Sequence, residues 1–91
     1  FTTPPLTFSG NELAINVDTS ATGHLQCELL DEQDQPIKGY ALADCDVVHS
    51  ANEINRVVSW KKNKDLSQLS GKTIRMRFVL RATDVYAFQF R

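Results

Sequence analysis

The chain has 91 residues, of which 42% are hydrophobic and 23% charged, and this composition is typical of one folded globular domain. A chain of this length has no room for a second hydrophobic core, and its formal net charge of −1 gives no overall attraction to nucleic acid or to an anionic membrane. No apolar stretch reaches the roughly 18–20 residues that a membrane-spanning helix needs. We therefore expect one domain whose partners include neither nucleic acid nor a membrane.

The charges are divided unevenly along the chain. Residues 1–55 hold nine acids and one base, and residues 56–91 hold nine bases and two acids, so the halves carry −8 and +7. If the halves interleave as neighbouring strands, opposite charges pair across the sheet and stabilise it. The alternative is a surface with separated charges that docks onto a partner domain.

The first five residues, Phe-Thr-Thr-Pro-Pro, lack the basic and apolar regions of a signal peptide. Two consecutive prolines stiffen a chain and are common between domains. We interpret residues 1–5 as the end of an inter-domain linker and residues 6–91 as a single β-sandwich domain.

Apolar and polar residues alternate along most of the chain, which is the pattern of half-buried β-strands. The alternating or extended segments are residues 6–8, 13–18, 24–29, 37–40, 54–60, 74–81 and 86–91. Small and polar stretches predict turns between them, at residues 9–11, 19–23, 31–36, 61–64 and 82–84.

Residues 65–69 predict one short helical turn, with Asp65 at its start and Gly71 near its end. Together these patterns predict an all-β fold of about seven to eight short antiparallel strands, arranged as a β-sandwich or a jelly roll.

No arrangement of residues in the sequence predicts catalysis. His24 and His49 are the only histidines, and no nucleophile motif such as G-x-S-x-G accompanies them. Asp44 and Asp46 resemble a glycosidase carboxylate pair, but acids two residues apart in a loop commonly bond the backbone of a turn. We expect this chain not to be an enzyme.

Acids in loops are better suited to binding calcium than to catalysis, because a calcium ion takes six to eight oxygen ligands. The candidate ligands are Asp18, Asp44, Asp46 and Asp84. No EF-hand spacing orders them, and such acids also cap turns. The sequence therefore calls for no cofactor and leaves a structural calcium ion open.

The two cysteines, Cys27 and Cys45, match no zinc, iron–sulfur or thioredoxin spacing. Cys27 falls on the apolar side of a predicted strand, and Cys45 lies between two acids, which raise the pKa of a thiol. A Cys27–Cys45 disulfide and two free thiols are both open, because spacing alone does not decide between them.

Sugar binding generally uses an exposed aromatic ring with polar groups nearby. Trp60 and Tyr86 share the alternation of the apolar residues in their strands, which favours packing in the core. Tyr40 follows Gly39 at the start of a loop and is the least constrained of the three. Tyr40 and Trp60 are therefore the candidate ligand-binding residues.

Several segments, taken in order, resemble one known family. They are residues 15–21 (INVDTSA), 28–32 (ELLDE), 36–40 (PIKGY), 42–46 (LADCD), 58–61 (VSWK), 65–72 (DLSQLSGK) and 80–90 (LRATDVYAFQF). This set resembles the small β-sandwich at the C-terminal end of secreted bacterial proteins with a glycosidase-like five-bladed propeller. It is similar to the sandwich that follows the propeller in invertase-like glycoside hydrolases. The basic turn at residues 61–64 departs from the Gly-rich turn expected there.

The resemblance implies a non-catalytic accessory domain of a larger carbohydrate-active protein, secreted or periplasmic. Its partner would be the catalytic domain of the same polypeptide, on which it packs and which it stabilises. The alternative is a carbohydrate-binding module that presents an aromatic platform to a glycan. No binding residues carry over from the family.

Overall fold

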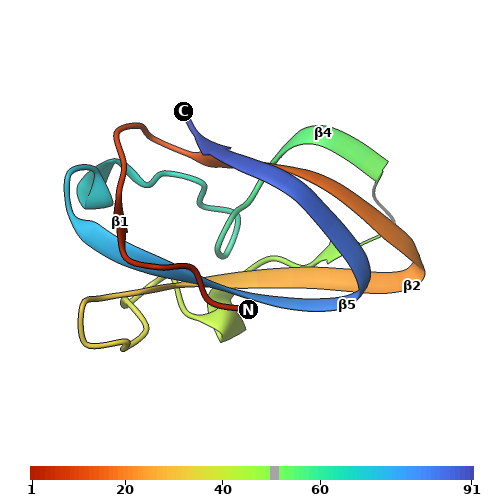
Figure 1. Ribbon diagram of the computed structural model, residues 1–91, viewed down its shortest axis with the longest axis horizontal. Helices are drawn as coiled ribbons and strands as arrows, with labels where there is room; N and C mark the ends of the chain where they lie inside the picture. Colours follow the sequence, from red (N-terminus) through yellow and green to blue (C-terminus); the bar gives the residue numbers. More distant parts are fainter. Residues whose placement is uncertain (50–51) are drawn as a thin grey trace.

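Two long antiparallel strands, β2 (Leu13–Leu30) and β5 (Thr73–Phe90), dominate the fold of this chain. The computed structural model describes residues 1–49 and 52–91 (Figure 1). The two strands have 18 residues each and pair along almost their whole length, from Leu13 opposite Phe90 to Leu30 opposite Arg75.

Three short strands complete the sheet, and they are β1 (Leu6–Thr7), β3 (Val48–His49) and β4 (Asn52–Val57). β1 pairs with the start of β5, whereas β3 and β4 both pair with the opposite edge of β2. Within residues 1–49 and 52–91, the result is one antiparallel sheet of five strands. The prediction of an all-β fold is confirmed, but the described residues form five strands and not the seven to eight short strands expected.

Two of the predicted turns lie inside strands, and this explains the difference in strand number. Residues 19–23 belong to β2 and residues 82–84 belong to β5. Thr19 pairs with Thr83 and His24 with Arg81, so four residues of β2 stand opposite the single residue Ala82. Such an irregularity bends a pair of strands without ending it.

The bend brings the two halves of the β2–β5 ribbon face to face, as Figure 1 shows. The described strands thus form one curled antiparallel sheet, and the two-layer sandwich and the jelly-roll strand order stay predictions. The core between the halves holds Leu13, Ile15, Val17, Leu25, Cys27, Leu29, Val58, Trp60, Leu66, Ile74, Met76 and Phe78.

The first three residues join the edge of the sheet, and the interpretation of residues 1–5 as the end of a linker stays a prediction. The N–H of Phe78 donates to the carbonyl of Phe1, and the N–H of Thr3 donates to the carbonyl of Met76, each at 2.8 Å. Thr3 is buried, and its hydroxyl accepts the N–H of Met76 at 3.0 Å. Residues 1–3 are therefore part of the edge of the domain.

The helical turn predicted near residues 65–69 is confirmed as the 3₁₀ turn η2 (Ser67–Leu69). The carboxylate of Asp65 accepts the N–H of Ser67 at 2.9 Å, and this bond lowers the pKa of Asp65. Gly71 follows with a φ of +83°, which suits a glycine after a helical end.

A second 3₁₀ turn, η1 (Leu42–Asp44), lies between β2 and β3. None of the helical segments in the described part of the chain is long and apolar enough to span a membrane.

Candidate functional site

The candidate sugar-binding residues Tyr40 and Trp60 both lie in the core. Their exposed fractions are 7% and 1%, and their rings pack edge to face with centroids 5.5 Å apart. The Tyr40 hydroxyl donates to the carbonyl of Asp65 at 2.8 Å, and the Trp60 indole N–H donates to that of Cys27 at 2.9 Å. Neither ring offers a face to solvent, so the expected aromatic platform cannot form from this pair.

The placement of Tyr40 follows from the glycine before it. Gly39 has a φ of +89°, which a glycine adopts readily, and the N–H of Tyr40 donates to the carbonyl of Ile37 at 2.8 Å, which closes the turn. The carbonyl of Tyr40 then accepts the N–H of Leu29 at 3.0 Å, which fixes the loop against β2. Burial raises the pKa of the Tyr40 phenol, and the charge of Asp65 adds to the effect.

The four candidate calcium ligands fall into two pairs. Asp18 and Asp84 are directly opposite each other in the β2–β5 pairing. Asp44 forms an ion pair with Lys61 at 3.3 Å, and one oxygen of Asp46 accepts the Ser59 hydroxyl and the Lys62 N–H, each at 2.6 Å. In residues 1–49 and 52–91, no three His, Cys, Asp or Glu side chains lie together as a possible metal site.

Asp46 stabilises the turn at Lys61 and Lys62. The hydrogen bonds from Ser59 and from the Lys62 backbone lower the pKa of its carboxyl below the usual value. They also hold the tight turn at Lys61 and Lys62, whose φ angles are +50° and +64°. Two successive positive φ angles are typical of a type I′ turn, which normally contains Asn and Gly.

The two histidines are Cα partners, His24 in β2 and His49 in β3. Nothing in their sequence spacing predicts this. Residues directly opposite in an antiparallel pair place their side chains on the same face of the sheet. No third potential ligand joins them within the described chain, so they do not by themselves form a metal centre.

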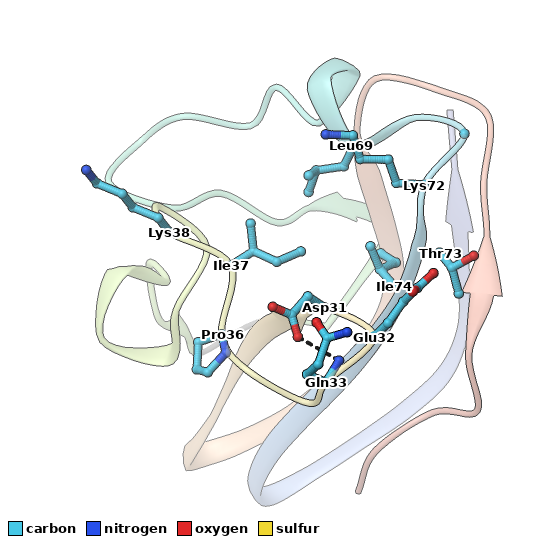
Figure 2. A pocket seen from close by; sticks show the side chains of 11 residues that line it. Asp31, Glu32, Gln33, Pro36, Ile37, Lys38, Leu69, Lys72, Thr73 and Ile74 are labelled. Carbon is cyan, nitrogen blue, oxygen red and sulfur yellow. Dashed lines mark hydrogen bonds between the residues drawn. The ribbon is translucent and has the colours of Figure 1, made fainter.

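An open groove of about 630 Å³ lies between residues 31–38 and residues 69–74 (Figure 2). Ile37, Leu69 and Ile74 give it an apolar lining, and none of the described residues that line it is aromatic. The carboxylate of Asp31 accepts the N–H groups of Gln33 and Gln35, at 2.9 and 3.0 Å, and so stabilises one wall. The groove can receive an aliphatic side chain, but it has no ring on which a sugar could stack.

The five phenylalanines of the chain form one continuous row. Successive ring centroids are 5.1 Å apart for Phe1–Phe78, 6.3 Å for Phe78–Phe88, 6.3 Å for Phe88–Phe90 and 4.2 Å for Phe90–Phe8. Phe78 and Phe8 are buried, whereas Phe1 and Phe88 are 64% and 40% exposed. Two exposed rings therefore flank the buried Phe78. Phe88 shares the alternation of residues 86–91, which favours the core, yet its ring is partly exposed. The sequence contained no signal for the contact made by Phe1.

The exposed ring of Phe88 lies on a stretch of β5 whose outer side has no partner strand in the structure. β1 and residues 1–3 cover the outer side of β5 only as far as Phe78. Beyond it, no described residue pairs with that side of residues 79–89, which we call the open edge. The open edge carries the exposed charged residues Arg81 and Asp84.

Tyr86 lies on the open edge and is 69% exposed, so its predicted place in the core is wrong. Asn16 pairs with Ala87 and Val17 with Val85, which leaves Tyr86 as the additional residue of a β-bulge. A bulge shifts the alternation of side chains by one position. Tyr86 therefore turns to solvent, while Val85 packs against the core.

The described ion pairs each join an acid of residues 1–55 to a base of residues 56–91. They are Lys61–Asp44, Lys64–Glu12, Arg75–Asp34, Arg77–Glu28 and Arg91–Glu12, at 2.8–3.4 Å. The acidic and basic halves thus interleave in the folded chain, as the first interpretation of the charge pattern expected. Most of these side chains are partly exposed, so each pair contributes about 0–1 kcal/mol.

The described surface thus offers two features for a partner, the apolar groove and the open edge beside two exposed phenylalanines. Asp31, in the wall of the groove, and Asp46, away from both features, accept hydrogen bonds that stabilise turns. Comparison of the chain with family models, with curated proteins and with solved structures finds no match.

Proposed function

We propose that this chain is a non-catalytic accessory domain that packs on a catalytic domain of the same polypeptide and stabilises it. The observation that carries the proposal is the open edge of β5 with Phe1 and Phe88 exposed beside it. Natural proteins generally cover a long unpaired strand edge, and exposed aromatic rings beside it favour an interface.

The two exposed rings supply the apolar part of this interface. Together they expose about as much surface as one whole phenylalanine side chain. Covering that surface contributes roughly 2 kcal/mol, which is useful between linked domains although too little for tight binding between separate molecules. A partner side chain that packs between Phe1 and Phe88 would also cover Phe78, which contacts both rings.

The open edge favours a neighbouring domain over a second copy of the chain. Ala82 has a φ of +46°, and the Tyr86 bulge follows four residues later. These two irregularities, with the charges of Arg81 and Asp84, disfavour the regular pairing of one strand edge with another. Packing by side chains against a preformed surface is not hindered in this way.

The kind of neighbour is suggested by the family resemblance, which implies a glycosidase-like propeller in a secreted carbohydrate-active protein. In such a protein the chemistry belongs to the propeller, and this domain contributes stability.

The test compares thermal unfolding of the polypeptide that contains both domains with that of its Phe88→Thr variant. We expect the variant to lower the Tm of the catalytic domain while the isolated chain changes little, because Phe88 is already partly exposed. Val47→Thr is the matched control, since Val47 is 41% exposed and precedes β3. An unchanged Tm for Phe88→Thr would count against the proposal, as would an equal loss for Val47→Thr.

A second candidate function is carbohydrate binding, and the observation that favours it is the exposure of Tyr86. Its ring is 69% exposed on the bulge and could stack on a sugar, a role that Tyr40 and Trp60 cannot take in their buried positions. Changes in the chemical shifts of the backbone amides of residues 79–89, followed by NMR during titration with oligosaccharides, test this function. Shifts that disappear in Tyr86→Ala would support it, and unchanged spectra at millimolar sugar would exclude it.

A further inference from the structure

Cys27 and Cys45 are free, buried thiols that lie next to each other in the fold. Cys27 faces the core from the second half of β2, and Cys45 immediately follows η1. The backbone N–H of Cys27 donates to the sulfur of Cys45 at 3.3 Å. The sulfur of Cys45 therefore lies against the backbone of Cys27, and in addition to burial the charge of Cys45 raises the pKa of the Cys27 thiol, as expected for neighbouring side chains.

The residues around both cysteines hold the two segments together. The side-chain amide of Gln26 donates to the carbonyls of Leu42 and Cys45, both at 3.4 Å. On the other side of Cys27, the carboxylate of Glu28 accepts the N–H of Leu42 at 3.2 Å. A covalent bond between the cysteines would therefore join segments that are already in place.

Trp60 adds a third connection between the same two segments. It forms a bridge with Cys45 through the backbone, and its indole N–H donates to the carbonyl of Cys27 at 2.9 Å. As donors, the thiols make long contacts, 3.7 Å from Cys27 to the carbonyl of Glu28 and 3.5 Å from Cys45 to that of Asp46. A thiol is a weak donor, so losing these contacts costs little.

We propose that Cys27 and Cys45 are a disulfide-forming pair, and that the folded chain forms this bond when a disulfide oxidant such as oxidised glutathione is present. The bond closes a loop that includes residues 31–38, one wall of the groove in Figure 2. The proposal does not depend on what packs against the open edge.

The reaction is a pair of thiol–disulfide exchanges. Cys45, which is 5% exposed where Cys27 is fully buried, loses its proton and attacks one sulfur of oxidised glutathione. This step forms a mixed disulfide and releases one glutathione thiolate. Cys27 then loses its proton and attacks the Cys45 sulfur, which forms the intramolecular bond and releases the second glutathione thiolate. The two protons lost by the protein leave with the two glutathione thiols, so two protein thiols are oxidised and one glutathione disulfide is reduced.

The reaction in the folded state is expected to be slow. Burial raises the pKa of both thiols, and so the attacking thiolate is scarce until the segment around Cys45 opens locally. The test must therefore measure the equilibrium position of the reaction.

The experiment equilibrates the chain with reduced and oxidised glutathione until the protein mass stops changing, then quenches it with acid and measures intact mass. The intramolecular bond removes about 2 Da, whereas a glutathione adduct adds mass. The same equilibrium is measured in concentrated guanidinium chloride. A disulfide that fits the fold gives a larger equilibrium constant for the folded chain than for the unfolded one. A smaller constant in the folded chain, or only adducts and dimers, would overturn the proposal.

Thermal unfolding gives an independent measurement on the same samples. The oxidised chain is expected to melt about 10 °C higher than the reduced chain, because the bond restricts the unfolded state. Cys45→Ser is the control and should show no rise in Tm on oxidation. An equal rise in Cys45→Ser, or a lower Tm for the oxidised wild type, would contradict the proposal.

Discussion

Gly23 lies directly against the backbone of Ala82, at the point where the two long strands bend. A Cβ atom at Gly23 would collide with the carbonyl oxygen of Ala82 and would lie 2.7 Å from that of Arg81. The Thr83 hydroxyl lies 2.7 Å from the Arg81 carbonyl and 3.2 Å from that of His24, and it closes the same corner. This close approach lets β2 and β5 turn together, and the turn encloses the core.

Gly23→Ala should therefore destabilise the chain by about 1–3 kcal/mol, because the added methyl group meets backbone that cannot move without distorting the bend. Chemical denaturation measures the change. Gly39→Ala is an informative comparison, since the space around Gly39 is open and its cost comes only from a φ of +89°. A Gly23→Ala variant as stable as the wild type would show that the corner can relax.

Lys62→Gly should stabilise the chain by roughly 0.5–1 kcal/mol. Lys62 has a φ of +64°, which a glycine adopts without strain, and its N–H bond to Asp46 does not depend on the side chain. The ion pair between Lys61 and Asp44 is kept. The free energy of unfolding from urea titration checks this, with Lys64→Gly as the control that should lose stability. A loss of stability in Lys62→Gly would show that the lysine side chain itself matters to the turn.

Asp46 should contribute to stability in a pH-dependent way. Its pKa is lowered in the folded state, so its contribution is present above the pKa of the unfolded chain and is lost as the pH falls through the folded value. Asp46→Asn should therefore reduce stability at neutral pH and flatten the loss of stability below about pH 4. Urea titrations across the acid range measure both effects, with the exposed Glu32→Gln as the control. An unchanged acid limb in Asp46→Asn would contradict the role assigned to its hydrogen bonds.

Asp84→Asn should raise stability at neutral pH by about 0.2–1 kcal/mol. Asp84 is directly opposite Asp18, and like charges at opposed positions of an antiparallel pair repel. The gain should shrink as salt is added, because both groups are at least partly exposed. Urea titration at low and high ionic strength measures it. A loss of stability, or a gain that does not depend on salt, would mean that repulsion does not govern this pair.

Along much of the two long strands, the alternation of apolar and polar residues was enough to predict which side chains face the core. The apolar positions of β2 and of the first half of β5 face the core as expected, as does Trp60. The helical turn near residues 65–69 was also predictable, because Asp65 and Gly71 act on neighbouring residues.

What the sequence could not predict depends on contacts between distant segments. The stretch at residues 19–23 has the composition of a turn, and only its place opposite Ala82 makes it a bend inside a strand. The same pairing places the bulge at Tyr86 and turns that ring to solvent. The positions of Phe1 beside Phe78 and of Cys45 beside Cys27 likewise follow from the register of the folded chain.

The central claim is that the open edge of β5 is a docking surface for a neighbouring domain. Hydrogen–deuterium exchange of the outward-facing amides of residues 79–89 tests it most directly, measured in the isolated chain and in the polypeptide that contains both domains. We predict rapid exchange in the isolated chain and slower exchange when the neighbour is present, while the amides of residues 31–38 do not change. Equal exchange of residues 79–89 in both proteins would contradict the claim.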